Sequence, residues 1–93
     1  PTPAVCGTPL HAAEDLISSV ETDRGFYSGA VGWCTSDGDG EYMVAIRCAE
    51  IAAGGASARA WAGGGIVASS SADKELAETT AKLRTIMRAL GLQ

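Results

Sequence analysis

The chain has 93 residues, of which 46% are hydrophobic, and a formal net charge of −4. This length supports one small domain, and the acidic balance excludes nucleic acids and anionic membranes as partners, since both need a basic surface. No apolar run approaches the roughly 18 residues of a transmembrane helix, and the three cysteines form no CxxC pair. Widely spaced, unpaired cysteines are typical of a reducing compartment, so we expect a cytoplasmic protein.

The chain begins with PTPAVCG instead of methionine, from which we expect a portion of a longer protein.

The residues that follow predict a helix. Thr8 is predicted to cap a helix over residues 9–21, because Pro9 suits the first helical position. Apolar residues follow at helical spacing: Leu10, Ala13, Leu16, Ile17 and Val20. This spacing predicts an amphipathic helix.

The middle of the chain predicts strands. Runs rich in small and β-forming residues cover 26–35, 41–51 and 56–63. Glycine-containing turns separate these runs, at SDGDG (36–40) and at Gly54-Gly55. Although DGDGE resembles the start of a calcium loop, the alternating segments on both sides favour a hairpin turn. The pattern predicts a three-stranded antiparallel meander between two helices, which is an α+β fold.

Arg47 is a candidate anion ligand. Alternation along residues 41–51 predicts that Arg47 lies in the middle of a strand, on the same face as Ala45 and Ala49. Small neighbours leave room beside the guanidinium, which binds carboxylates through two parallel hydrogen bonds.

The C-terminal segment predicts a helix between a capping box, Ser70 to Asp73, and a terminating Gly91. At about 100° per residue, three charged residues share one face: Glu75, Glu78 and Lys82. An apolar stripe expected to dock on the core runs beside them: Leu76, Leu83, Ile86, Met87 and Leu90. Two interpretations of the charged face remain open. One is a surface salt bridge between Glu78 and Lys82; the other is a site for a divalent metal and an anionic ligand.

The glycines before this helix favour the second interpretation. GGGIVA (63–68) partly matches a dinucleotide-binding fingerprint, but three serines separate it from the helix and no second βαβ strand follows. A strand of glycines still leaves backbone N–H groups open to a carboxylate. Carboxylates beside Arg47 and Lys82 are consistent with Mg²⁺ held between the protein and an anionic substrate.

Five ordered motifs carry a family resemblance. They are PTPAVCGTP, DRGFYSGAVGW, GDGEYMVAIRCA, AGGGIV and E-x-x-E-T-x-x-K-L, and together they cover nearly the whole chain. In this order they resemble the C-terminal part of chorismate-utilising enzymes, and most closely the isochorismate synthases of the siderophore type. The resemblance implies a portion, residues 1–93, of a chorismate-binding domain with two stacked antiparallel sheets flanked by helices.

The resemblance also implies the site. It assigns Mg²⁺ as cofactor, with Glu78 as a ligand and Glu75 as the second acid near the metal. The residues implied to bind substrate are Arg47, Gly63, Gly65, Lys82, Ala4 and Tyr27. Arg47 and Lys82 would meet substrate carboxylates, and the glycines would approach the substrate through their backbone. Tyr27 matches a tyrosine in some members and a phenylalanine in others.

The implied reaction is the conversion of chorismate to isochorismate, for siderophore or menaquinone biosynthesis. Ala4 favours it, because lyases of the family tend to have threonine at that position. The general-base lysine and general-acid glutamate of the family have no counterpart here, so we expect the 93 residues to be inactive without the N-terminal remainder. A lyase making salicylate or anthranilate and an inactive anion-binding α+β module are the alternatives.

Overall fold

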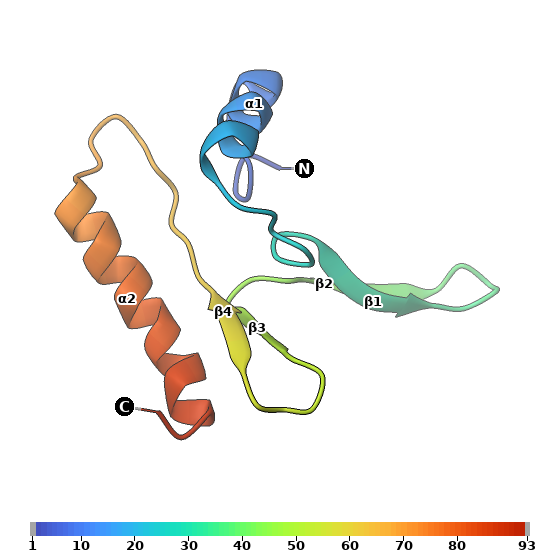
Figure 1. The fold of residues 1–93 in the computed structure, drawn as a ribbon. Coiled ribbons are helices and arrows are strands. Elements are labelled where there is room, and N and C mark those ends of the chain that lie inside the picture. The colour runs from blue at the N-terminus through green and yellow to red at the C-terminus, as the bar shows by residue number, and fades with distance from the viewer. Residues whose placement is uncertain (1, 93) are drawn as a thin grey trace.

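The computed structural model describes residues 2–92 and has an α+β architecture, as expected (Figure 1). The elements follow in the order α1 (Leu10–Val20), β1 (Ala30–Cys34), β2 (Gly40–Val44), β3 (Cys48–Ile51), β4 (Ala58–Trp61) and α2 (Ala72–Ala89). Both helices lie where the apolar spacing predicts them. Among the described residues, no helix is long and apolar enough to cross a membrane.

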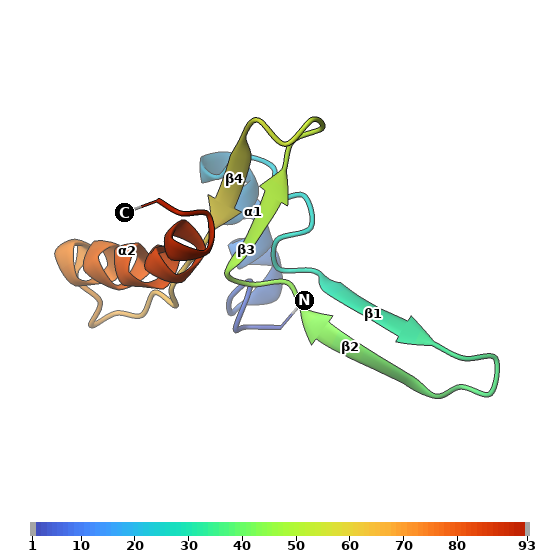
Figure 2. The ribbon, with the colours of Figure 1, turned by 90° about the horizontal axis from the view of Figure 1, so that it is seen from below.

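The strands form two separate hairpins, so the predicted three-stranded meander is wrong. β1 pairs with β2 in antiparallel register, with Trp33 opposite Glu41, and β3 pairs with β4, with Cys48 opposite Trp61. The turn predicted at 36–40 is confirmed: Gly38 has φ +92°, and the Thr35 N–H donates to the Asp39 oxygen at 2.7 Å. The two hairpins extend in different directions (Figure 2).

Arg47 lies outside both sheets, and its backbone conformation explains why residues 41–51 do not form one continuous strand. Its φ of +48° is in the left-handed region, which a non-glycine residue rarely adopts. Just before it, the Ile46 N–H donates to the Val44 oxygen at 3.1 Å, in a tight turn. The expected strand 41–51 is therefore divided into β2 and β3, and the prediction of a mid-strand Arg47 is wrong.

The helix caps differ from the expected ones at the N-terminal ends. Pro9 occupies the cap position of α1 without a side-chain bond, so Thr8 is not the cap. Ser71 caps α2 by accepting from the Lys74 N–H at 3.4 Å, whereas the Ser70 hydroxyl accepts from Val67 N. The predicted capping box from Ser70 to Asp73 is thus wrong: the N-cap is Ser71, and the third helical position holds Lys74, which cannot complete a capping box. A short turn formed by Ser70 with Val67 supplies the reason, since it engages the hydroxyl before the helix starts.

Gly91 ends α2 as predicted. It has φ +73°, and the following Leu92 N–H donates to the Met87 oxygen at 2.7 Å. The Gly91 N–H donates to the Arg88 oxygen at 3.0 Å. These two bonds form a Schellman motif, in which glycine is favoured because it has no Cβ to strain the left-handed conformation.

The described part of the chain has no buried core. None of residues 2–92 is buried, and Phe26 is 83% exposed. The accessible surface is 7419 Å², whereas a compact protein of this mass exposes about 5,000 Å². The radius of gyration is 15.6 Å, compared with about 12 Å for a compact domain of this length. The elements are spread apart, with the β1-β2 hairpin projecting away from α2 (Figure 1).

The inward face of α2 combines part of the expected apolar stripe with two charged residues, Glu75 and Lys82. α2 packs against β4, and its half-buried residues are Glu75, Thr79, Lys82, Leu83, Ile86 and Met87. Leu76 is 67% exposed and Leu90 is 41% exposed, so these two members of the predicted stripe do not dock here. The packing therefore places Glu75 and Lys82 beside the chain that leaves β4.

Candidate functional site

The candidate site lies where residues 63–65, the glycine segment, pass along α2 after β4 (Figure 1). Lys82 connects the two: its Nζ donates to the Gly63 backbone oxygen at 3.0 Å and to Glu78 Oε1 at 2.5 Å. The Lys82 side chain is 23% exposed and that of Glu78 is 55% exposed. The predicted salt bridge is therefore confirmed, and its lysine also fixes the glycine segment against the helix.

Both glutamates of α2 point toward the middle glycine of the segment. A Cβ placed on Gly64 would lie 2.9 Å from Glu75 Oε2 and 3.9 Å from Glu78 Oε1. The absence of a side chain at Gly64 therefore allows both carboxylates to approach the backbone. Sequence analysis selected Gly63 and Gly65 and missed Gly64. The middle glycine of GGG was the available signal, since the dinucleotide fingerprint accepts any residue at that position.

Tyr27 reaches the same segment from the other half of the chain. A Cβ on Gly63 would lie 2.5 Å from the Tyr27 hydroxyl oxygen. The hydroxyl thus lies against the backbone of Gly63, whose carbonyl oxygen also accepts the hydrogen bond from Lys82. The structure therefore brings Tyr27 to the same glycine that accepts a hydrogen bond from Lys82 of α2.

Electrostatics connects Arg47 to this cluster. The hydrogen bond from Lys82 lowers the pKa of Glu78 below its ordinary value, and the charges of Lys82 and Arg47 lower it further. Glu78 is therefore ionised at neutral pH. Although Arg47 is in a turn and not in a strand, its charge therefore acts on Glu78.

Two predicted residues are not in the cluster. Gly65 has no atom within 4 Å of the position of an added Cβ, so its surroundings are open. Ala4 lies exposed in the turn of residues 2–6, where the Cys6 N–H donates to the Thr2 oxygen at 3.0 Å. Among the described residues, no hydrogen bond connects Ala4 to the glycine segment or to α2.

The two glutamates could supply some of the ligands of a metal ion, and the other ligands would have to come from elsewhere. Glu75 and Glu78 converge on Gly64, but among residues 2–92 no three His, Cys, Asp or Glu side chains gather around one point. Mg²⁺ commonly takes one or two protein carboxylates and completes its octahedron with water and substrate oxygens. The two glutamates fit such a partial site, whereas a closed structural metal site would need more ligands.

Comparison with known proteins identifies the family. The chorismate binding enzyme family matches residues 1–91. MenF of Mycobacterium tuberculosis is 58% identical over 93 residues, covering 100% of this chain and 25% of MenF. The isochorismate synthase DhbC of Bacillus subtilis is 56% identical, over 99% of this chain and 23% of its own length. The vibriobactin-specific isochorismate synthase of Vibrio cholerae is 48% identical, over 100% of this chain and 23% of its own length.

These relatives confirm the resemblance that the five motifs carry. No solved structure matches the chain. The chain spans about a quarter of the length of the curated relatives. Because the family match extends over nearly all 93 residues, this chain belongs to the family of chorismate-binding enzymes.

Proposed function

We propose that the parent protein is an isochorismate synthase, and that this chain is the C-terminal portion of its chorismate-binding domain. The reaction proposed is the Mg²⁺-dependent conversion of chorismate to isochorismate, for siderophore or menaquinone biosynthesis. The observation that carries the proposal is the convergence of Tyr27, Glu75, Glu78 and Lys82 on the glycine segment. Close relatives named as isochorismate synthases support the reaction type.

The chain would supply the anion-binding part of the site. Chorismate has two carboxylates, and Arg47 offers a planar fork of donors for one of them. The backbone N–H groups of the glycine segment can approach the substrate because no Cβ covers them. Lys82 already donates to Glu78 and Gly63, so its role is to hold the helix and the glycine segment in place beside a substrate carboxylate.

Glu75 and Glu78 would hold the Mg²⁺ ion. The metal would neutralise a carboxylate of the substrate and so let two anions, protein and ligand, come together. Ionised carboxylates are required for this, and Lys82 keeps the pKa of Glu78 low. The remaining ligands would come from water, from the substrate and from the rest of the parent protein.

The proposed reaction adds the oxygen of water at C2 of chorismate and releases the C4 hydroxyl, while the enolpyruvyl ether stays attached. A general base must take a proton from the water, and a general acid must give one to the leaving hydroxyl. These two groups are proposed to lie in the N-terminal remainder. The remainder would also cover the exposed apolar side chains and complete the two-sheet fold. By this proposal, the 93 residues alone do not turn over chorismate.

The test uses the whole parent protein with chorismate and Mg²⁺. Isochorismate formed without pyruvate supports the proposal, whereas salicylate or anthranilate with an equivalent of pyruvate would assign a lyase. Glu78→Gln should lower turnover by at least about 100-fold and weaken Mg²⁺ binding. Glu41→Gln, on the exposed β1-β2 hairpin, is the matched control and should leave both unchanged. Unaltered Mg²⁺ dependence in Glu78→Gln would refute the metal assignment.

A further inference from the structure

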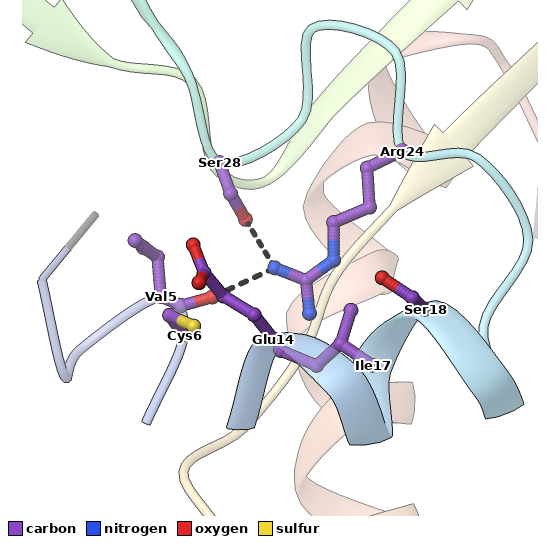
Figure 3. A pocket seen from close by; sticks show the side chains of 7 residues that line it. All are labelled: Val5, Cys6, Glu14, Ile17, Ser18, Arg24 and Ser28. Carbon is purple, nitrogen blue, oxygen red and sulfur yellow. Dashed lines mark hydrogen bonds between the residues drawn. The ribbon is translucent and has the colours of Figure 1, made fainter. Parts of the chain in front are cut away.

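Arg24, in the loop after α1, contacts several separate parts of the chain. Its Nε and Nη2 atoms donate to the two carboxylate oxygens of Glu21, at 2.6 and 2.8 Å. Its Nη1 atom donates to the Val5 backbone oxygen at 2.7 Å and to the Ser28 hydroxyl at 3.1 Å. The guanidinium carbon also lies 5.5 Å from the centre of the Tyr27 ring. Figure 3 shows the guanidinium between Val5 and Ser28.

These contacts suit arginine specifically. The paired bonds to Glu21 fix the plane of the guanidinium, which leaves Nη1 directed at Val5 and Ser28. Lysine offers a single nitrogen and could not make this set of bonds. The Arg24 side chain is 24% exposed, so its bonds are better shielded than those of a typical surface ion pair.

The position of Tyr27 depends on the same turn. The Tyr27 N–H donates to the Arg24 oxygen at 3.0 Å, and the Ser28 N–H donates to the Ala45 oxygen at 2.8 Å. The Arg24 guanidinium lies over the Tyr27 ring, while the hydroxyl at the far end of the ring reaches Gly63. Arg24 therefore limits how far the ring can move away from the glycine segment.

The bond to Val5 extends this role to the first residues of the chain. Val5 directly follows Ala4, and its carbonyl is held by a side chain 19 residues away. Among the described residues, no hydrogen bond joins Ala4 to the candidate site, so another contact must fix the position of this segment. Arg24 connects this segment to the turn that presents Tyr27.

We propose that Arg24 is a positioning residue, which holds the Tyr27 hydroxyl at Gly63 and the Ala4-Val5 segment on the same side of the site. It acts through Tyr27 and Val5 and does not touch the substrate. The expected effect of Arg24 on chorismate binding rests on the proposed function. Its expected effect on the position of the Tyr27 side chain is independent of that function.

The first test is a ¹⁹F NMR measurement on the whole parent protein with 3-fluorotyrosine at position 27. Arg24→Gln should shift or broaden the resonance, because the ring loses its cationic neighbour and its restraint. Arg24→Lys keeps the charge and should displace the resonance in the same direction, and it decides the test if Arg24→Gln does not fold. The control Arg84→Gln, on the exposed side of α2, should leave the resonance in place. An unshifted resonance in both Arg24 variants would overturn the proposal.

The second test is a double-mutant cycle on the KM for chorismate. Arg24→Gln and Tyr27→Phe should each raise KM. The increase in KM of the double variant should be only slightly larger than that of the more affected single variant, because Arg24 acts through Tyr27. Coupling of this kind amounts to about tenfold for residues in contact. Effects that multiply fully would mean that Arg24 does not act through Tyr27. If the wild-type protein does not convert chorismate, the proposed function fails, and the NMR test still decides the place of Tyr27.

Discussion

Gly64 controls how close the two carboxylates of α2 come to the backbone. The atoms that an added Cβ would meet are the ends of glutamate side chains, which can swing away. A side chain at Gly64 should therefore cost little stability but displace the carboxylates from their common point. This separates the glycine from structural glycines, whose replacement damages the fold.

The pair Gly64→Ala and Gly65→Ala tests this role. Gly64→Ala should weaken Mg²⁺ binding and lower turnover by about 10-fold or more, since outer contacts of a metal site typically matter by 10- to 100-fold. Gly65→Ala has open space around its Cβ and should have a smaller effect on metal binding. Isothermal titration with Mg²⁺ and steady-state kinetics on the whole protein measure both. Equal effects of the two substitutions would contradict the assignment.

Glu21 provides a prediction for pH. The hydrogen bond from Arg24 is the main cause that lowers the pKa of Glu21 below 4.5. A carboxylate with a lowered folded-state pKa contributes stability above its unfolded pKa and loses this contribution as pH falls through the folded value. The stability difference between wild type and Glu21→Gln should thus be constant at neutral pH and shrink below about pH 4.5.

The expected difference at neutral pH is at most about 1 kcal/mol, because both side chains are partly exposed. Thermal melts of the whole protein between pH 3 and 8 measure it. Asp15→Asn is the control, because among the described residues Asp15 makes no ion pair. A difference for Glu21→Gln that grows as pH falls would have the wrong sign.

At the scale of elements, the turn at Arg47 converts one long predicted strand into two short ones. Arginine in the left-handed region costs of order 1 kcal/mol relative to glycine. This cost is retained at a position from which the charge of Arg47 lowers the pKa of Glu78, which is consistent with a functional reason for arginine there.

Two substitutions separate the backbone of Arg47 from its side chain. Arg47→Gly should keep or raise stability by up to about 1 kcal/mol, because glycine adopts positive φ freely. Arg47→Val should lower stability, because a β-branched residue is strained there. Both remove the guanidinium and should raise the KM for chorismate. Chemical denaturation and kinetics of the whole protein check this, and a normal KM in Arg47→Gly would exclude Arg47 from substrate binding.

At the scale of the whole molecule, the main property is an open arrangement without a core. Apolar side chains as large as Phe26 and Met43 are more than three quarters exposed. Surfaces of this kind are covered in stable proteins, because burial of apolar area supplies most of the free energy of folding. The separation of the two hairpins has the same cause, since nothing in the described chain packs between them.

The isolated 93 residues should therefore fail to melt cooperatively and should bind an apolar dye such as ANS. Small-angle X-ray scattering should report a radius of gyration well above the roughly 12 Å of a compact domain of this length. The whole parent protein, as control, should melt cooperatively and bind little dye. A compact, cooperatively melting 93-residue chain would contradict the proposal that other parts of the protein cover these surfaces.

The helices, several turns and one ion pair could be predicted from the sequence, because the interactions that form them join residues only a few positions apart. Apolar spacing placed both helices, glycines placed the turns at 36–40 and at Gly91, and i,i+4 spacing predicted the Glu78–Lys82 pair. The five motifs led to the family.

Long-range placement required the three-dimensional structure. The break at Arg47 depends on how two hairpins diverge, which alternation along one strand does not report. The convergence on Gly64 and the contact of Tyr27 with Gly63 join residues from different elements, and the bonds of Arg24 span 19 residues. Local spacing carries no information about such contacts, because packing between distant segments determines them.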